Sequence, residues 1–168
     1  MTSFSHLDVQ RPQWRTVVIS VLAFWISSSL ILDLVIMPTL YASGMMTEAN
    51  FATAGYSIFW VFNRIELVCA AVVLTGGMIL RRQLSTANWQ HHRTVLLSLA
   101  LLSIGLFYTY GLTPEMSALG LPLNLFETAT EIPTRMNLMH GEYWVLEVCK
   151  LAIGTVLLGN YYKSPVNA

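Results

Sequence analysis

The chain has 168 residues, of which 55% are hydrophobic and only 11% are charged. Soluble domains carry about 25% charged residues, so this chain lacks the polar surface of an ordinary cytosolic enzyme. Nine Lys and Arg balance nine Asp and Glu, which leaves no excess of positive charge for binding a nucleic acid. The two cysteines lie inside apolar runs and do not indicate a secreted disulfide scaffold. The remaining class is an integral membrane protein, with the lipid bilayer as its first partner.

Four apolar stretches are long enough to cross the roughly 30 Å hydrocarbon core of a bilayer as helices. They cover residues 17–37, 58–80, 94–112 and 138–159. We expect Pro38 to end the first stretch and Pro114 to end the third, because proline interrupts helical hydrogen bonding. The runs are too long and continuous for the strands of a barrel. The sequence therefore predicts an all-α fold, an integral membrane four-helix bundle that forms one domain over residues 1–168.

The stretch between the third and fourth predicted spans is apolar but bounded by prolines. Leucines recur there at every second position from Leu119 to Leu125, and Phe126 follows. A segment of this kind is typical of a piece that lies in the membrane interface. We predict an interfacial segment before the last helix, on the outer side.

The distribution of basic residues predicts the orientation of the chain. Lys and Arg accumulate in cytoplasmic loops. Only Arg135 falls on the side that holds the loop after the first span and the loop after the third. The opposite side carries Arg11, Arg15, Arg81, Arg82, Arg93 and Lys163. Both termini are therefore predicted to be cytoplasmic, in an inner membrane of bacterial type or a plasma membrane.

Ionisable residues inside the spans are the most informative feature of the sequence. Such residues are costly in lipid and usually face the bundle interior or a water-filled cavity. Their positions predict a polar layer near the outer face that serves as a ligand-binding site or a polar cluster. Its candidate members are Asp33, Asn63, Arg64, Glu66, His140, Glu142, Glu147 and Lys150.

Pairing within this layer follows from the cost of an isolated buried charge. Arg64 is expected to pair with a carboxylate from Asp33, Glu66 or Glu142. Glu147 and Lys150 are three residues apart on one helix and are expected to pair with each other. The same groups would also serve as structural links between helices, and some near the boundary would reach out to water.

His140 is the only histidine inside a predicted span. It precedes Gly141, which leaves room for close approach, so we expect the imidazole to face the bundle interior. Imidazole and thioether groups are ligands for copper, and imidazole also binds haem. His140 and Met139 are thus weak candidates for holding haem or copper, whereas a hydrogen bond to Asp33 or to a backbone carbonyl is the structural alternative.

Four strings together resemble a known family: DLVIMPTLY, NRIELVCAAVV, FYTYGLTPEM and RMNLMHGEYWVLEV. They are similar to the transmembrane protein 205-like domain family, small four-helix membrane proteins with a domain of unknown function. The resemblance covers residues 30–158, and its most specific part is the spacing of Arg135, His140 and Gly141. It implies the fold and the membrane location and carries no catalytic residues.

No phosphate-binding loop, nucleophile elbow or zinc-protease motif occurs in the chain. The first functional interpretation is therefore a non-enzymatic membrane protein. Its polar layer would bind a small ligand, or contact another membrane protein or a second copy of the chain. The alternatives are a haem- or copper-binding redox or metal-handling protein and a proton or ion pathway through Glu147, Lys150 and the outer carboxylates.

Overall fold

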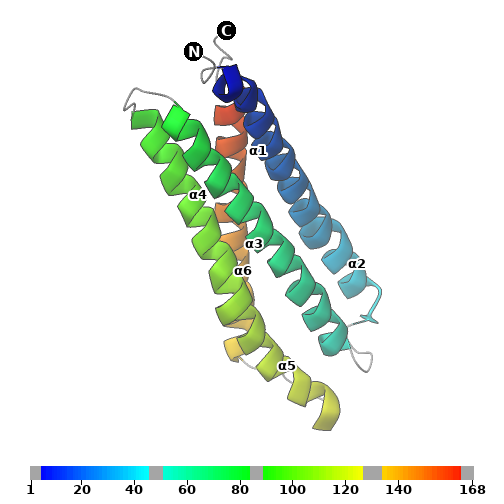
Figure 1. Ribbon diagram of the computed structural model, residues 1–168. Coiled ribbons are helices and arrows are strands. Elements are labelled where there is room, and N and C mark those ends of the chain that lie inside the picture. The colour runs from blue at the N-terminus through cyan, green and yellow to red at the C-terminus, as the bar shows by residue number, and fades with distance from the viewer. Residues whose placement is uncertain (1–4, 46–50, 84–88, 127–133, 164–168) are drawn as a thin grey trace.

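The computed structural model describes residues 5–45, 51–83, 89–126 and 134–163. These residues form helices and turns and no strand, which confirms the predicted all-α fold. Four helical runs pack side by side as a bundle (Figure 1). The runs are α1 (Ser5–Ile31) with η1 (Leu32–Ile36) and α2 (Met37–Ala42); α3 (Phe51–Gln83); α4 (Trp89–Phe107) with η3 (Tyr108–Leu112) and α5 (Thr113–Phe126); and α6 (Thr134–Lys163).

Three of these runs are long and apolar enough to cross a membrane. The qualifying stretches are Gln13–Ala42, Thr53–Leu80 and His92–Leu119. Helix α6 is not among them, and its length includes the charged residues Glu142, Glu147 and Lys150. The chain is accordingly a multi-pass membrane protein.

Neither Pro38 nor Pro114 ends its helix, contrary to the expectation from sequence. Each proline follows a single turn of π-helix, η1 or η3, and the helix continues beyond it. Proline has no N–H, and its ring clashes with the carbonyl four residues earlier; a wider π turn accommodates both effects. The last bond of each turn joins residues five apart, Met37 N–H to Leu32 O and Thr113 N–H to Tyr108 O.

The segment predicted to lie at the outer interface is the helix α5, which continues directly from η3. It packs mainly on α3, and its far end extends past the rest of the bundle (Figure 1). Arg135, near the start of α6, forms an exposed ion pair with Glu115 on α5. The placement of α5 along the membrane surface stays a prediction.

The interior is divided into a large apolar core and a smaller one. The large core joins α1, α3, α4 and α6, and Val18, Leu22 and Val73 are fully buried in it. A Cβ atom at Gly76 of α3 would lie 2.3 Å from Cγ2 of Val18, and one at Gly77 would lie 2.8 Å from Oη of Tyr161. Glycine at these two positions therefore leaves room for the Val18 side chain of α1 and for the Tyr161 hydroxyl group of α6.

The start of α1 is held against the end of α6. Arg15 donates from Nε to the carbonyl of Tyr161 and from Nη2 to the carbonyl of Tyr162, both at 2.8 Å. Carbonyl groups in the last turn of a helix have no partner within that helix, so this arginine satisfies two of them. The first and last helices consequently begin and end at the same end of the bundle (Figure 1).

Candidate functional site

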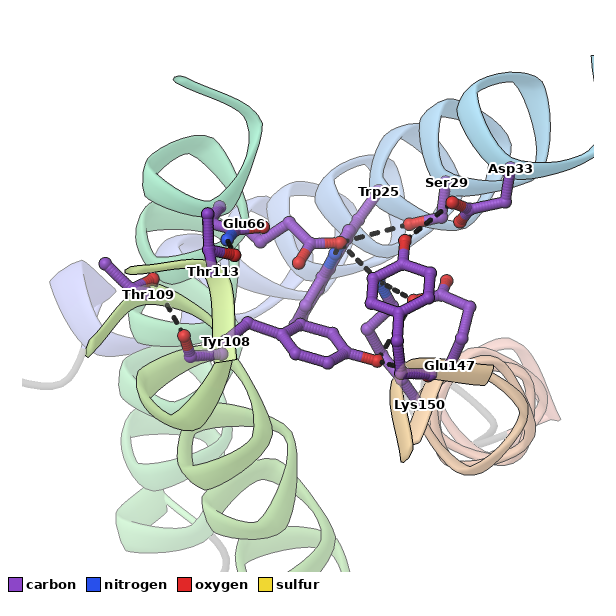
Figure 2. A network of polar contacts seen from close by, with 12 residues as sticks. Trp25, Ser29, Asp33, Glu66, Tyr108, Thr109, Thr113, Glu147 and Lys150 are labelled. Carbon is purple, nitrogen blue, oxygen red and sulfur yellow. Dashed lines mark hydrogen bonds and ion pairs between the residues drawn. The ribbon is translucent and has the colours of Figure 1, made fainter. Parts of the chain in front are cut away.

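Four ionisable side chains are buried together in the middle of the bundle, between the two apolar cores. The exposed fractions are 4% for Asp33, 1% for Glu66, 1% for Glu147 and 3% for Lys150. They come from η1, α3 and α6, and Figure 2 shows them converging from these elements. We call this set the buried network, together with the side chains that hydrogen-bond to it: Trp25, Ser29, Tyr108 and Tyr143.

Lys150 lies at the centre of the buried network. Its Nζ forms an ion pair with Oε1 of Glu66, and it lies 2.6 Å from Oε2 of Glu147 (Figure 2). The predicted pairing of Glu147 with Lys150 along α6 is confirmed. One ammonium therefore links α3 to α6 through two carboxylates.

Helix α1 joins the network through donors to the same oxygen of Glu66. Trp25 Nε1 donates to Oε1 of Glu66 at 2.9 Å, and Ser29 Oγ donates to it at 3.2 Å. Both donors are buried. Three donors from two helices thus surround one carboxylate oxygen.

Two tyrosines extend the network to η1 and η3. Tyr143 Oη donates to Oδ1 of Asp33 at 2.6 Å. Tyr108 Oη lies 3.1 Å from the carbonyl oxygen of Tyr143 and 3.3 Å from Oε2 of Glu147, so its one proton reaches either acceptor. The two rings pack with centroids 5.2 Å apart. Tyr143 therefore holds Asp33 against α6, and Tyr108 reaches from η3 to Glu147.

Each of the three carboxyl groups keeps one oxygen without a hydrogen-bond partner among the described residues. These atoms are Oδ2 of Asp33, Oε2 of Glu66 and Oε1 of Glu147. Beside Lys150, Trp25 and Ser29 lies a cavity of about 10 Å³. Most of its lining is apolar, and none of the three carboxyl groups lines it. The network thus combines three carboxyl groups with a single ammonium.

Both π-helical turns contribute to this site. Asp33 lies in η1 and Tyr108 lies in η3. A π turn shifts the faces of the following residues relative to an uninterrupted α-helix, and such turns occur frequently at functional sites. The two prolines that shape these turns therefore also place Asp33 and Tyr108.

Arg64 is not part of the buried network, so its expected pairing with a carboxylate is wrong. Its side chain is exposed, and none of the ion pairs among the described residues includes it. Nη1 donates instead to the carbonyl of Trp60 at 2.9 Å, and the guanidinium stacks on the Trp60 ring. The physical reason is helical geometry: Arg64 and Glu66 are separated by about 200° around α3, and Glu66 takes the inner face. Lys150 supplies the buried cation that we had assigned to Arg64.

His140 also lies on the outside of the bundle, contrary to the prediction. It is exposed, and its Nδ1 lies 2.8 Å from the carbonyl oxygen of Met136 on the same helix. A Cβ atom at Gly141 would meet nothing within 4 Å, so this glycine serves no close contact. At this end of α6 the residues that pack into the bundle are Met139 and Tyr143, and His140 lies beside that face rather than on it. Glu142 is exposed as well.

The weak metal candidates do not converge. Met139 is buried against Tyr108 and Leu112, whereas the next residue, His140, points outward. Within the described ranges, no group of three or more His, Cys, Asp and Glu side chains has the arrangement of a metal site. Asn63 is buried, and its Nδ2 donates to Oγ1 of Thr113 at 2.7 Å, which links α3 to α5 outside the buried network.

Reasoning from the sequence missed the uncharged members of the network, although a signal for them exists. Trp25, Ser29 and Asp33 recur at every fourth position of the first helical run. On α6, Tyr143 and Lys150 flank Glu147 at spacings of four and three. Positions three and four apart share a helix face, so each set forms a polar stripe on an otherwise apolar helix. Counting hydroxyl and indole donors together with charges would have revealed both stripes.

Residues 20–121 match a family model described as Domain of unknown function (DUF4149). The match covers more than half of the chain and includes Trp25, Asp33, Glu66 and Tyr108, whereas α6 lies beyond it. No curated protein and no solved structure matches the chain. On the strength of the model match, the chain belongs to the DUF4149 family, whose domain has no known function.

Proposed function

We propose that the buried network is a proton-binding site inside the membrane and that the protein takes up and releases protons there. The observation that carries this proposal is the burial of three carboxyl groups against one ammonium. If all four groups were ionised, two negative charges would remain uncompensated in a medium of low dielectric constant, which is very unfavourable. Binding of protons to carboxyl groups would remove this excess of negative charge.

The hydrogen bonds support movement of protons within the site. Tyr143 donates to Asp33, Tyr108 lies within reach of Glu147, and Lys150 links Glu147 to Glu66. Each of these donors carries an exchangeable proton, and each partner is an acceptor that can hold one. The carboxyl oxygens without partners provide further positions for a proton.

A purely structural link between helices is the competing interpretation. Complete hydrogen bonding is typical of links that stabilise, because an unsatisfied buried polar atom destabilises the fold. The three carboxyl oxygens without partners favour proton binding over this interpretation.

Infrared difference spectra of the purified protein, recorded across a pH titration, test the proposal. Protonated carboxyl groups have a distinct C=O stretching band. We expect such a band to change with pH in the wild type and to be altered in Glu66→Gln, Glu147→Gln and Asp33→Asn. Glu142→Gln is the matched control, because Glu142 is an exposed carboxyl group on the same helix as Glu147. An unchanged band in all three network variants would contradict the proposal.

Proton transfer across the membrane is tested separately. Liposomes containing the protein and a pH-sensitive dye would be exposed to a pH gradient. We expect Glu66→Gln and Glu147→Gln to slow the dissipation of the gradient relative to the wild type and to Glu142→Gln. Equal rates for all four proteins, combined with a normal infrared titration, would restrict the function to proton binding without passage.

We also propose that α6 crosses the membrane as a fourth span, with both termini cytoplasmic. The support is its packing along α1 and α4 and the six basic residues on the predicted cytoplasmic side. The strings around Asp33, Glu66 and Tyr108 further support a relationship to the transmembrane protein 205-like domain family. The exposed His140 and Glu142 support a contact there with another membrane helix, from a different protein or a second copy.

A further inference from the structure

A second polar feature lies on the outer surface, between α3 and the π turn η3. It is a pocket of about 190 Å³. Its wall on α3 includes Tyr56, Trp60 and Arg64, and its opposite wall includes Tyr110 of η3. Asn63 and Thr113, which are hydrogen-bonded to each other, also line it, whereas its lining includes no described residue of the buried network.

Arg64 is the one charged residue among the described residues that line this pocket. The guanidinium carbon lies 3.4 Å from the centroid of the Trp60 ring, and Nη1 is bound to the Trp60 carbonyl. These two contacts fix the guanidinium plane and leave most of its five donors without a partner among the described residues. The exposed carboxylate of Glu115, which follows Pro114 of the pocket lining, is already paired with Arg135.

An exposed guanidinium within a membrane-spanning stretch is costly unless an anion or water meets it. The contact with Trp60, one turn earlier, shows that the side chain turns back toward the start of α3. Tyr and Trp residues such as Tyr56, Trp60 and Tyr110 are typical of the headgroup level of a bilayer. These aromatic residues support a position of the pocket near the level of the lipid headgroups.

We propose that this pocket binds a phosphate group, either that of a lipid headgroup or that of a free phosphate compound. Arginine presents parallel N–H donors that match two oxygens of a phosphate. Tyr56 and Tyr110, which line the pocket on two different helical elements, each carry a hydroxyl group that can donate a further hydrogen bond. A phosphate has more acceptor oxygens than a carboxylate, and therefore suits a pocket with possible donors on both walls.

Native mass spectrometry of the full chain in detergent micelles tests the proposal with four probes: phosphatidylglycerol, inorganic phosphate, diacylglycerol and oleate. We expect the wild type to bind phosphatidylglycerol more tightly than diacylglycerol. Arg64→Gln should weaken that binding by roughly tenfold, the loss expected for one charge-assisted contact. Arg93→Gln, which removes an exposed arginine at the other end of the bundle, should leave it unchanged.

The four probes distinguish a lipid headgroup from a free phosphate compound as the source of the bound phosphate. Inorganic phosphate that displaces phosphatidylglycerol and binds in an Arg64-dependent way identifies a free phosphate compound as the ligand. Phosphatidylglycerol bound without such competition identifies a lipid headgroup. The proposal is overturned if Arg64→Gln binds both phosphate probes as the wild type does, or if oleate alone shows the dependence on Arg64.

Two variants keep the test independent of folding. Arg64→Lys preserves the charge but loses the parallel donors, so its affinity should fall between those of the wild type and Arg64→Gln. Trp60→Leu removes the ring that orients the guanidinium and should also weaken binding. Unchanged affinity in both variants would contradict the geometry on which the proposal rests.

Discussion

At the scale of single residues, the buried network depends most on Lys150. Its ammonium is the only cation among the described residues of the network, and it contacts carboxylates on two helices. A buried charge that loses its partner is much more costly than a buried pair. The network therefore tolerates removal of a carboxylate better than removal of the lysine.

We expect Lys150→Met to lower the free energy of unfolding by about 3–5 kcal/mol, because Glu66 and Glu147 lose their shared cation. Unfolding in increasing concentrations of a denaturing detergent would measure the change. Lys163→Met, at the exposed end of the same helix, is the control and should have little effect. The triple variant Lys150→Met/Glu66→Gln/Glu147→Gln should recover much of the loss, and a triple variant no more stable than the single one would contradict the assignment.

At the scale of the elements, α3 is a helix on which several others pack. It packs on α1, α4 and α5, and it carries Glu66 on its inner face. Gly76 lets Val18 of α1 approach its backbone closely. The distance between α1 and α3 is therefore set by the absence of a side chain at this position.

We expect Gly76→Ala to lower the free energy of unfolding by about 1–3 kcal/mol, because the new methyl group overlaps the buried Val18 side chain. Gly55→Ala on the same helix meets nothing within 4 Å and is the matched control. It should be neutral or slightly stabilising, since alanine favours a helix more than glycine does. Thermal unfolding of both variants would check the difference, and equal effects would contradict this packing.

The π turns are the other feature at this scale. We expect Pro38→Ala to let η1 relax to an ordinary α-helix, which turns Asp33 away from Tyr143. In the wild type, Asp33→Asn and Tyr143→Phe should be coupled by about 1–2 kcal/mol, because the hydrogen bond joins them directly. A double-mutant cycle repeated in the Pro38→Ala background should show that coupling largely lost. Coupling of undiminished size there would mean that the proline does not maintain the turn.

At the scale of the whole molecule, the arrangement of the ends bears on the proposed topology. Arg15 ties the start of α1 to the last turn of α6, so both terminal helices reach the same end of the bundle. An even number of crossings would place them on one side of the membrane.

Labelling of single cysteines would test the proposed cytoplasmic location of both ends. The background should carry Cys69→Ser and Cys149→Ser, because Cys149 is exposed and would otherwise react. We expect Ser3→Cys and Ala168→Cys to react with a membrane-impermeant reagent only after the membrane is opened. Reaction of either position in intact cells would refute this orientation.

The fold was predictable because long apolar runs determine membrane helices almost independently of their neighbours. The Glu147–Lys150 pair was predictable too, since both residues lie on one helix. Arg64 and His140 were misplaced because depth along a helix says nothing about which face a neighbouring helix covers. Trp25, Tyr108 and Tyr143 were missed because aromatic residues are common in membrane helices, and only the packing of several helices shows that these bind carboxylates.

The dependence of Glu66 on Lys150 also constrains how the chain is made. Helices α1 and α3 leave the ribosome before α6, so Asp33 and Glu66 enter the bilayer while their last partners are still unsynthesised. During that interval the nascent chain carries unsatisfied carboxyl groups in lipid, a state that membrane chaperones and proteases recognise. A chain truncated before α6 should therefore be degraded rapidly, and the same truncation carrying Asp33→Asn and Glu66→Gln should persist longer in a pulse-chase experiment. Insertion of α6 is thus the step after which we expect the newly synthesised chain to resist degradation.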